Sequence, residues 1–351
     1  MKNEVFSQRL KNARLIQGMT QDEVVFALGE TLSKNALSRY ERGEMMPRYH
    51  ILVALAKVLK VQLEYFFRPF TVSISQLDFR TKQELPSMER ERLQLEVSAI
   101  MERYLLTEQL LGLESRFVNP LQALPALKTA EEAEEAAQRL REAWKLGDHG
   151  LMNIYGMIES FGIKVIEITT SEAFDGMTGT VNDNIPMIVV NTAMTVERKR
   201  FTVLHELAHI LLWFDASLEP KMIERICNRF AGAVLMPSEL LKDLIGPTRE
   251  QIGLRELILI KNHFGISLQA LMYRAAELNY ISRATIDRFR NYIKTNPREV
   301  DLGDFHGKET ADRFEQLVVR AYHSNRITRS KAAELLQVQE QDLDRFYDVI
   351  W

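Results

Sequence analysis

The residues in this sequence best suited to chemistry are two histidines four positions apart, with a glutamate directly after the first. His205, Glu206 and His209 form the pattern His-Glu-x-x-His in a mostly apolar run. Residues four apart lie on one face of a helix, so both imidazoles can bind one metal ion. Glu206 lies beside them and can act as general base toward a metal-bound water. The alternative is chance, since most histidines at this spacing are ordinary core or surface residues.

A catalytic zinc site needs a further ligand, because such sites take three protein ligands and keep one position open for water. Glu224 is the best candidate from the residues themselves. At helical spacing it shares a face with Cys227 and other small residues, so its carboxylate is expected to point inward. Three other carboxylates remain alternatives, although they lie near expected helix ends or in polar surroundings: Asp215, Glu219 and Glu239.

Composition narrows the class of protein. The chain has 351 residues, 46% hydrophobic and 26% charged, which is typical of a globular protein of two or three domains. No apolar run is long enough to span a membrane, and the first residues do not resemble a signal peptide. The single cysteine, Cys227, excludes an intramolecular disulfide and fits a reducing compartment. We therefore expect a cytoplasmic protein with no membrane partner.

Positive charge is concentrated in the first seventy residues. They carry 11 Lys and Arg against 7 Asp and Glu, a net charge of +4, whereas the remainder carries −7. A basic first domain on an acidic body indicates that nucleic acid would contact the first domain.

The first seventy residues also show the signals of several short helices. Thr20 and Glu23 form a capping box, Ser33 can cap a helix over residues 34–41, and Pro47 suits the first turn of another helix. Apolar residues near Phe66 would close a small core. We expect a five-helix domain in which two short helices joined by a tight turn form a helix-turn-helix.

This region resembles the phage-repressor-like (XRE, Cro/C1-type) DNA-binding domain over about residues 4–67. The resemblance is carried by Thr20-Gln21, by LSKNALSRYERGE at 32–44 and by Pro47. It implies that four residues face bases or phosphates and that a fifth touches the DNA backbone: Lys34, Asn35, Ser38 and Arg39, with Gln21 as the fifth. Lys and Arg neutralise phosphate, while Asn and Arg can read base edges. The alternatives are a helical bundle with solvated polar residues, or the same fold binding protein.

Three strand patterns precede the histidine motif, at residues 162–168, 177–181 and 186–191. A small sheet beside an active-site helix is an α+β arrangement. We therefore expect a mainly α, α+β chain with a zincin-like metallopeptidase domain.

The string RFTVLHELAH at 200–209, followed by ERICNRFAGAVLMP at 224–237, resembles the ImmA/IrrE family of metallopeptidases over about residues 150–280. The resemblance implies a gluzincin-like site: His205, His209 and Glu224 would bind the metal, and Glu206 would be the base. Zinc is the default ion for such ligands, with manganese or iron as alternatives.

Cys227 departs from the family pattern, which usually has alanine at this position. Cysteine behaves as a small hydrophobic residue in protein cores, so we interpret Cys227 as a packing residue. The alternative is a fourth, thiolate ligand, which would close the site.

The expected division of the chain has four parts: a helix-turn-helix domain at 1–70, a helical linker at 71–149, the metallopeptidase domain at 150–280 and a helical region at 281–351. Within the linker, residues 130–146 are rich in Ala, Glu and Arg and predict an exposed helix. The C-terminal region resembles the tail of longer family members and is expected to serve packing or oligomerisation.

Together these features predict a DNA-binding transcriptional regulator with a metal-dependent endopeptidase domain. Its partners would be a double-stranded DNA operator and a protein substrate, a repressor or antitoxin-like protein in a stress response. A homodimer would match two operator half-sites. The chain itself is a further candidate substrate, with a cut between residues 70 and 150. The alternative is a non-proteolytic repressor whose metal domain senses a ligand or a metal.

Overall fold

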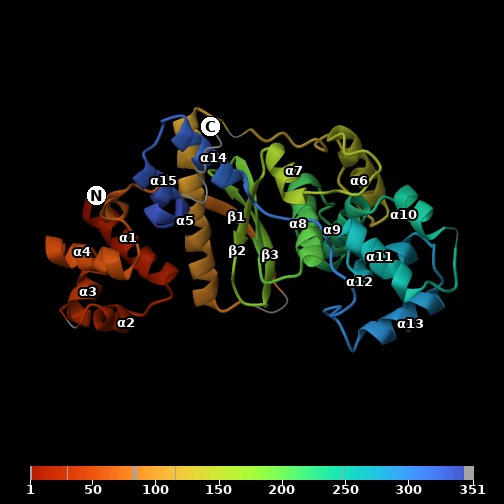
Figure 1. Cartoon of the computed structure of the whole chain (residues 1–351), viewed down its shortest axis with the longest axis horizontal. Helices are drawn as coiled ribbons and strands as arrows, with labels where there is room; N and C mark the ends of the chain where they lie inside the picture. The colour runs from red at the N-terminus through yellow and green to blue at the C-terminus, as the bar shows by residue number, and fades with distance from the viewer. Residues whose placement is uncertain (1, 30, 82–84, 115, 247, 344–351) are drawn as a thin grey trace.

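The computed structural model describes residues 2–29, 31–81, 85–114, 116–246 and 248–343, with the side chains of 76–81 left out. The first helical domain forms one end of the molecule, a sheet lies in the middle, and a cluster of helices forms the other end (Figure 1).

The N-terminal domain is built from short capped helices around a small core. The Thr20–Glu23 capping box is present, and Ser33 caps the third helix through the backbone N–H of Ala36. The fifth element is a 3-10 helix, whose Phe66 is fully buried. The elements are α1 (Lys2–Ile16), α2 (Gln21–Ala27), α3 (Lys34–Glu41), α4 (Tyr49–Val58) and η1 (Leu63–Phe67).

The central sheet has the strand order β1-β3-β4-β2. β2 and β4 are parallel, while β3 is antiparallel to both β4 and β1. The strands are β1 (Ile74–Thr81), β2 (Lys164–Ile168), β3 (Phe174–Val181) and β4 (Ile185–Asn191). Three of them match the strands expected from sequence. β1 was not expected, because the segment that contains it was interpreted as part of a helical linker.

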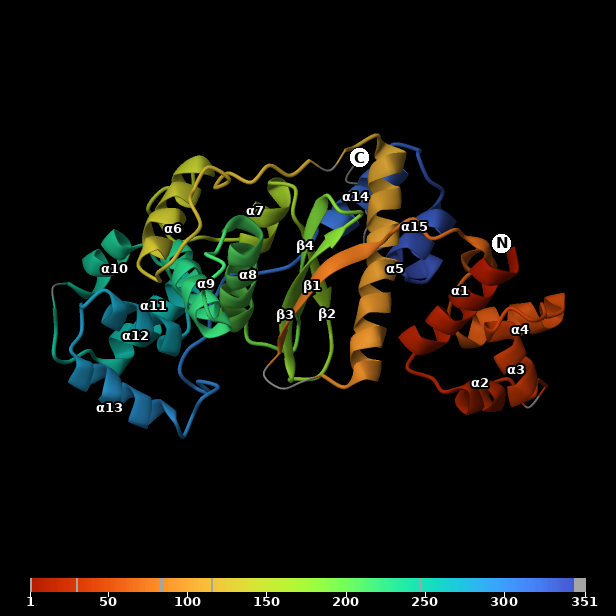
Figure 2. The same cartoon turned by 180° about the vertical axis from the view of Figure 1, so that it is seen from behind.

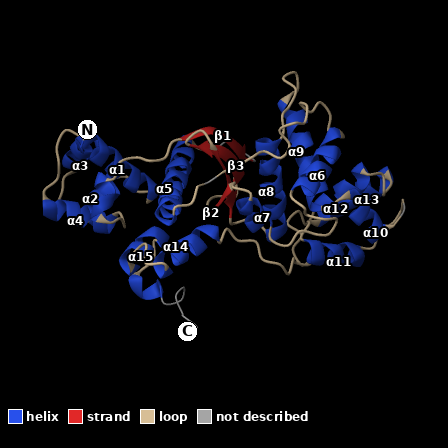
Figure 3. Cartoon of the chain, turned by 90° about the horizontal axis from the view of Figure 1, so that it is seen from above, coloured by secondary structure: helices blue, strands red, loops and turns tan. Residues whose placement is uncertain are grey.

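Each face of the sheet is covered by one long helix. α5 (Ser87–Leu111) lies on one side and α8 (Val196–Leu211) on the other, as the view from above shows (Figure 3). Along β4 the side chains alternate: Val189 packs in the cluster with α5, and Val190 packs in the cluster with α8. This alternation follows from the two-residue period of a strand that is buried on both faces.

The remaining helices of the far end pack around α8. α6 is amphipathic rather than the exposed helix expected from its charges, because an alanine-rich face packs against α9. Its Glu134 also accepts hydrogen bonds from two buried arginines of α9 and α12, Arg229 and Arg274. The bounds are α6 (Glu132–Ala143), α7 (Ile154–Ser160), α9 (Pro220–Leu235), α10 (Ser238–Ile245), α11 (Leu254–Phe264), α12 (Leu268–Glu277) and α13 (Arg283–Ile293).

The first domain and the C-terminal helices both dock on α5. From α1, the buried Arg9 donates to Glu102 of α5 at 2.7 Å. From α14 (Arg313–His323), Phe314 stacks on Tyr104 of α5, with ring centroids 5.4 Å apart. α14 also packs against α15 (Arg329–Leu336), which is followed by η2 (Glu340–Leu343). Helix α5 is therefore the element that joins the three parts of the chain.

A segment between α13 and α14 returns to the active-site helix. Arg200 of α8 is fully buried and pairs with Glu309. It also donates to the carbonyls of Gly265 at 3.0 Å and Leu151 at 2.6 Å. Part of the region expected to be a separate C-terminal tail thus holds α8 in place. Among the described helices, none combines the length and apolar composition that crossing a membrane requires.

Candidate metal and active site

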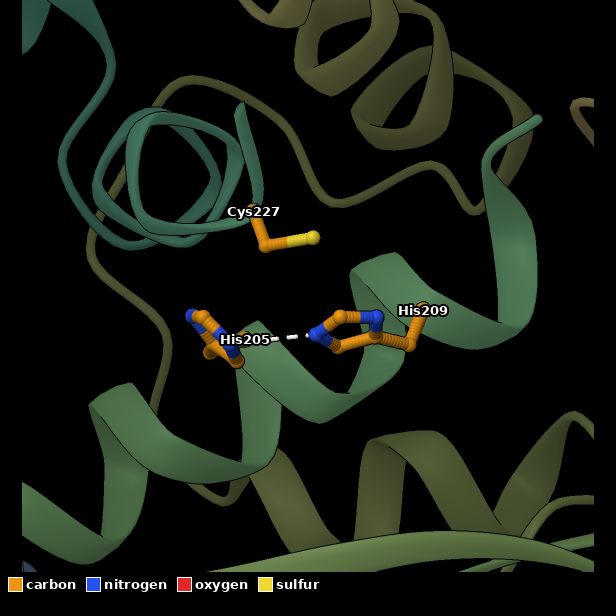
Figure 4. Close-up of side chains that lie close together, drawn as sticks. All are labelled: His205, His209 and Cys227. Carbon is orange, nitrogen blue, oxygen red and sulfur yellow. Dashed lines mark hydrogen bonds between the residues drawn. The ribbon is translucent and has the colours of Figure 1, made fainter. Parts of the chain in front are cut away.

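Helix α8 carries the two histidines of the site. Thr195 caps its N-terminus by accepting a hydrogen bond from the backbone N–H of Arg198. His205 is fully buried, whereas the side chain of His209 keeps 14% of its surface exposed. Their Nε2 atoms are 3.2 Å apart, so both rings present a nitrogen to the same point (Figure 4). This is the arrangement that the four-residue spacing predicts.

Helix α9 supplies a carboxylate to the same point. Glu224 Oε2 lies 3.3 Å from His205 Nε2, and Glu224 Oε1 lies 3.5 Å from His209 Nε2. Hydrogen bonds from both histidines, of which the one from His205 has the larger effect, hold the pKa of the Glu224 carboxyl far below its usual range. The structure places Glu224 beside both histidines. Two of the alternative third ligands have other partners: Asp215 accepts a hydrogen bond from Ser217, and Glu239 forms an ion pair with Lys242.

Asn228 orients His205 from the opposite side of the ring. His205 Nδ1 is 3.0 Å from Asn228 Oδ1, so this nitrogen donates, and Nε2 is the nitrogen that would give up its proton and offer its lone pair to a metal ion. Sequence reasoning did not single out Asn228. Its position four residues after Glu224, on the same helical face, was the signal available.

Cys227 also belongs to this group. The donor atoms of His205, His209 and Cys227 all lie within 4.8 Å of one another. Burial raises the pKa of the Cys227 thiol. Burial lowers the pKa of His209, but hydrogen bonds to Cys227 and Glu224 outweigh it and raise that pKa to about 10. Cys227 therefore contacts the site directly as well as packing in the core.

The distances between the donor atoms of His205, His209 and Glu224 are those expected around a zinc ion. Ligand atoms about 2.1 Å from a tetrahedral zinc are roughly 3.4 Å from one another. The separations between the His205, His209 and Glu224 donors are 3.2, 3.3 and 3.5 Å. Two imidazoles and one carboxylate are also a ligand set used by catalytic zinc.

Glu206 lies on the side of α8 that faces the sheet. It is 1% exposed. Strand β3 passes directly against it, because a Cβ atom at Gly176 would lie 3.5 Å from Glu206 Cγ and 3.0 Å from Thr202 Cγ2. A glycine at this position lets the strand approach the glutamate closely.

A cavity of about 680 Å³ lies beside Glu224, one of the three donors. Its wall includes Glu224 and Asn228 of α9 and Thr202 of α8. Apolar side chains line another part of it: Met194, Phe201, Ala270 and Tyr273. Charged side chains such as Arg198, Lys221 and Glu277 line the rest, and a cavity of this size with a mixed lining can take a side chain of a bound peptide.

In the N-terminal domain, the residues expected to contact DNA lie mostly on one face of α3. Lys34, Asn35 and Arg39 are exposed, and Ser38 is half-buried. Two of them pair with acidic neighbours: Lys34 with Asp22 at 2.7 Å, and Arg39 with Glu44 at 3.3 Å. The half-buried Gln21 donates to Glu41 at 2.8 Å. Sequence reasoning did not anticipate these acidic partners.

Comparison with known families agrees with both halves of this structure. Residues 158–276 match the peptidase M78 family, described as the IrrE N-terminal-like domain, and residues 10–66 match a helix-turn-helix family. Both matches lie within the domains expected from sequence.

Two curated relatives are each named radiation response metalloprotease IrrE. The protein from Deinococcus deserti is 34% identical over 106 residues, which cover 26% of this chain and 36% of the relative. The protein from Deinococcus radiodurans is 34% identical over 77 residues, which cover 18% of this chain and 24% of the relative. The chain thus spans about a third of the length of these relatives or less. Residues 10–66 are therefore similar to helix-turn-helix domains, and residues 158–276 are similar to the IrrE N-terminal-like peptidase domain.

Proposed function

We propose that this chain is a DNA-binding regulator whose second domain is a metal-dependent endopeptidase acting on a regulatory protein. The observation that carries the proposal is the convergence of two imidazoles and one carboxylate beside a buried glutamate. His205, His209 and Glu224 would hold one divalent ion, with zinc as the default.

When bound, the ion supplies a Lewis acid that polarises the scissile carbonyl and lowers the pKa of a coordinated water. The chain provides the remaining groups. Glu206 accepts the proton of the attacking water on its carboxylate and returns it to the departing amine nitrogen. Asn228 holds His205 in one tautomer and orientation through Nδ1. The adjoining cavity would take a side chain of the substrate and fix the peptide before reaction.

The N-terminal domain would bind an operator through the exposed face of α3. Lys34, Asn35 and Arg39 are accessible there, and their exposed ion pairs can be exchanged for contacts with phosphate. A homodimer would place two such faces on successive half-sites. A fragment of residues 1–70 should bind duplex DNA at low salt, and failure to bind would remove the operator from the proposal.

A second candidate function is a repressor whose metal site only senses metal or ligand. It is favoured by one observation, the position of Cys227 among the donor atoms. A thiolate ligand would complete a closed, four-ligand site of the structural kind.

The experiment that separates the two candidates compares host cells carrying wild type and Glu206→Gln, with and without DNA damage. Mapping new protein N-termini across the proteome identifies any substrate directly. Termini that require wild type support the endopeptidase and show whether the substrate is a repressor or the chain itself. If wild type and Glu206→Gln give identical termini under several stresses, with metal bound to both proteins, the endopeptidase is ruled out and the metal- or ligand-sensing repressor is favoured.

A further inference from the structure

The outermost strand of the sheet comes from a distant part of the chain. β1 pairs antiparallel with β3, and among the residues that the structure describes no other strand lies beyond it in the sheet (Figure 2). In the register, Arg80 is opposite Gly176 and Thr81 is opposite Phe174. The carboxyl end of β1 therefore runs beside the part of β3 that contacts Glu206.

This placement brings a peptide backbone close to the catalytic centre proposed above. Neighbouring strands are about 4.8 Å apart, so the backbone at Arg80 and Thr81 lies one strand spacing from Gly176. A Cβ atom at Gly176 would in turn lie 3.5 Å from Glu206 Cγ, so the strand runs close to that side chain. The register shifts between Arg80 and Thr81, so one step along β1 is opposite the two steps from Gly176 to Phe174 on β3. Such bulges are frequent next to active sites, where they alter the direction of a strand.

β1 lies outside the part of the chain that matches the peptidase family. The match covers residues 158–276, which include β2, β3 and β4. Within that unit alone, β3 would be a free edge strand next to Glu206. A free edge presents unpaired backbone N–H and C=O groups and is a template for an extended peptide.

We propose that a peptide substrate binds as an extended strand beside β3, in the position that β1 occupies, so that β1 and the substrate compete. This inference rests on the proposed endopeptidase function and specifies its substrate class. The ligand is an unfolded polypeptide segment, held by main-chain hydrogen bonds to β3.

Two side chains in the turn between β3 and β4 hold the amino end of β1: Asn182, and Asp183, which accepts a hydrogen bond from Ser75 Oγ at 2.9 Å. Asn182 accepts a hydrogen bond from the Ser73 backbone N–H at 2.9 Å and donates to the Thr71 carbonyl at 3.2 Å. This anchor follows directly on the first domain, where Arg9 holds the Pro69 carbonyl at 2.9 Å. The segment that leads into β1 is therefore anchored both to the first domain and to the turn after β3.

The first test locks β1 in place. Residues 78 and 178 are directly opposite each other in the ladder, so Asp78→Cys with Thr178→Cys can form a disulfide across β1 and β3. The natural Cys227 is buried and does not interfere. With zinc-loaded full-length protein and fluorescein-labelled casein as an unfolded probe, the oxidised lock should cleave at least about tenfold more slowly than the reduced form. Wild type treated with the same oxidant is the control.

The second test loosens β1 without altering the catalytic groups. Asn182 has φ of +49°, which glycine adopts readily, so Asn182→Gly keeps the turn. It removes both hydrogen bonds that the Asn182 side chain makes to the Ser73 N–H and the Thr71 carbonyl, and it leaves the Ser75–Asp183 bond in place. It should speed casein cleavage roughly threefold to tenfold, because more of the protein has a free β3 edge. The matched control is Asn325→Gly, at φ +55° in another part of the chain, which should leave the rate unchanged.

A binding measurement keeps this inference separate from the proposed activity. A fluorescein-labelled peptide of residues 72–81 is titrated into Glu206→Gln protein that also carries the lock or Asn182→Gly, with anisotropy as the readout. The peptide should bind the loosened protein and not the oxidised lock. If no variant cleaves casein but the lock still blocks the peptide, the strand site stands and the endopeptidase fails. Equal peptide binding or equal cleavage by locked and reduced protein, or no peptide binding to any variant, overturns the inference.

Discussion

The metal-site region and the proposed DNA-binding face use polar residues in opposite ways. His205 and Glu206 are 0% and 1% exposed, and their neighbours come from two helices and a strand. On α3, the side chains of Lys34 and Arg39 are 59% and 48% exposed, and each is paired with one acidic residue.

The difference determines how each region responds to change. The buried His205 and Glu206 are organised before a ligand arrives, and low local polarity strengthens their interactions, whereas the third donor, Glu224, keeps 48% of its side chain exposed. Exposed ion pairs contribute little by themselves and are weakened by salt, so they can exchange partners. We expect substitutions in the first region to have large effects and low sensitivity to salt, and those in the second to have smaller, salt-dependent effects.

The largest effect is expected for Glu206→Gln. Loss of the general base should lower the rate of peptide cleavage by about 10²- to 10⁴-fold. The two histidines and Glu224 are untouched, so zinc content measured by mass spectrometry should match wild type. Cleavage at the wild-type rate by the zinc-loaded variant would show that Glu206 is not the base.

The next largest effect is expected for Arg200→Ala, which tests whether buried charge holds the active-site helix. The change leaves Glu309 buried without its cation, so the free energy of unfolding should fall by about 3–5 kcal/mol. Arg290→Ala removes an exposed ion pair with Asp287 and should cost no more than about 0.5 kcal/mol. Urea denaturation of both variants measures the contrast, and equal losses would contradict it.

Asn228→Ala should weaken metal binding through its effect on His205. Loss of the hydrogen bond at Nδ1 frees the ring to rotate and change tautomer, and such changes typically lower metal affinity about 10- to 100-fold. Competition with a zinc-binding dye measures the dissociation constant. An unchanged constant would mean that packing alone orients His205.

On the DNA-binding face, Arg39→Ala should weaken binding to a duplex selected from a random pool by about 1–3 kcal/mol if Arg39 reads a base. Glu44→Gln should strengthen DNA binding instead, because it removes the anion that pairs with Arg39. Binding isotherms over a range of salt concentrations measure both. If Arg39→Ala has no effect at low salt, this face does not bind DNA.

The smallest effect is expected at Glu159, a buried carboxyl remote from both regions. Burial raises the pKa of Glu159 to about 7, against the hydrogen bond from Tyr104. Because the folded state holds the proton more tightly than the unfolded state, wild-type stability is lost as pH rises from about 4.5 to 7. Glu159→Gln removes this loss and should gain roughly 1–3 kcal/mol over wild type at pH 8. Urea denaturation at pH 5 and pH 8 measures the difference, and an equal effect at both pH values would contradict it.

Local patterns made much of the architecture predictable. The Thr20 capping box, the Ser33 cap and the alternation along β4 depend on residues a few positions apart, and each element forms where expected. β1 was missed, because a short edge strand has only weak local signals and its partner lies about a hundred residues further along the chain. The burial of one face of α6 was also missed, because its glutamates predicted an exposed helix. In the structure one of them, Glu134, pairs with the buried Arg274.

The sequence by itself determined the pairing of His205 with His209, because helical periodicity places residues four apart on one face whatever surrounds them. It also restricted the third ligand to a few carboxylates. Only the tertiary structure brought Glu224, Asn228 and Cys227 of α9 to those histidines and placed β1 beside Gly176. These are contacts between elements distant in sequence, and their geometry depends on how the helices and strands pack, which no local pattern encodes.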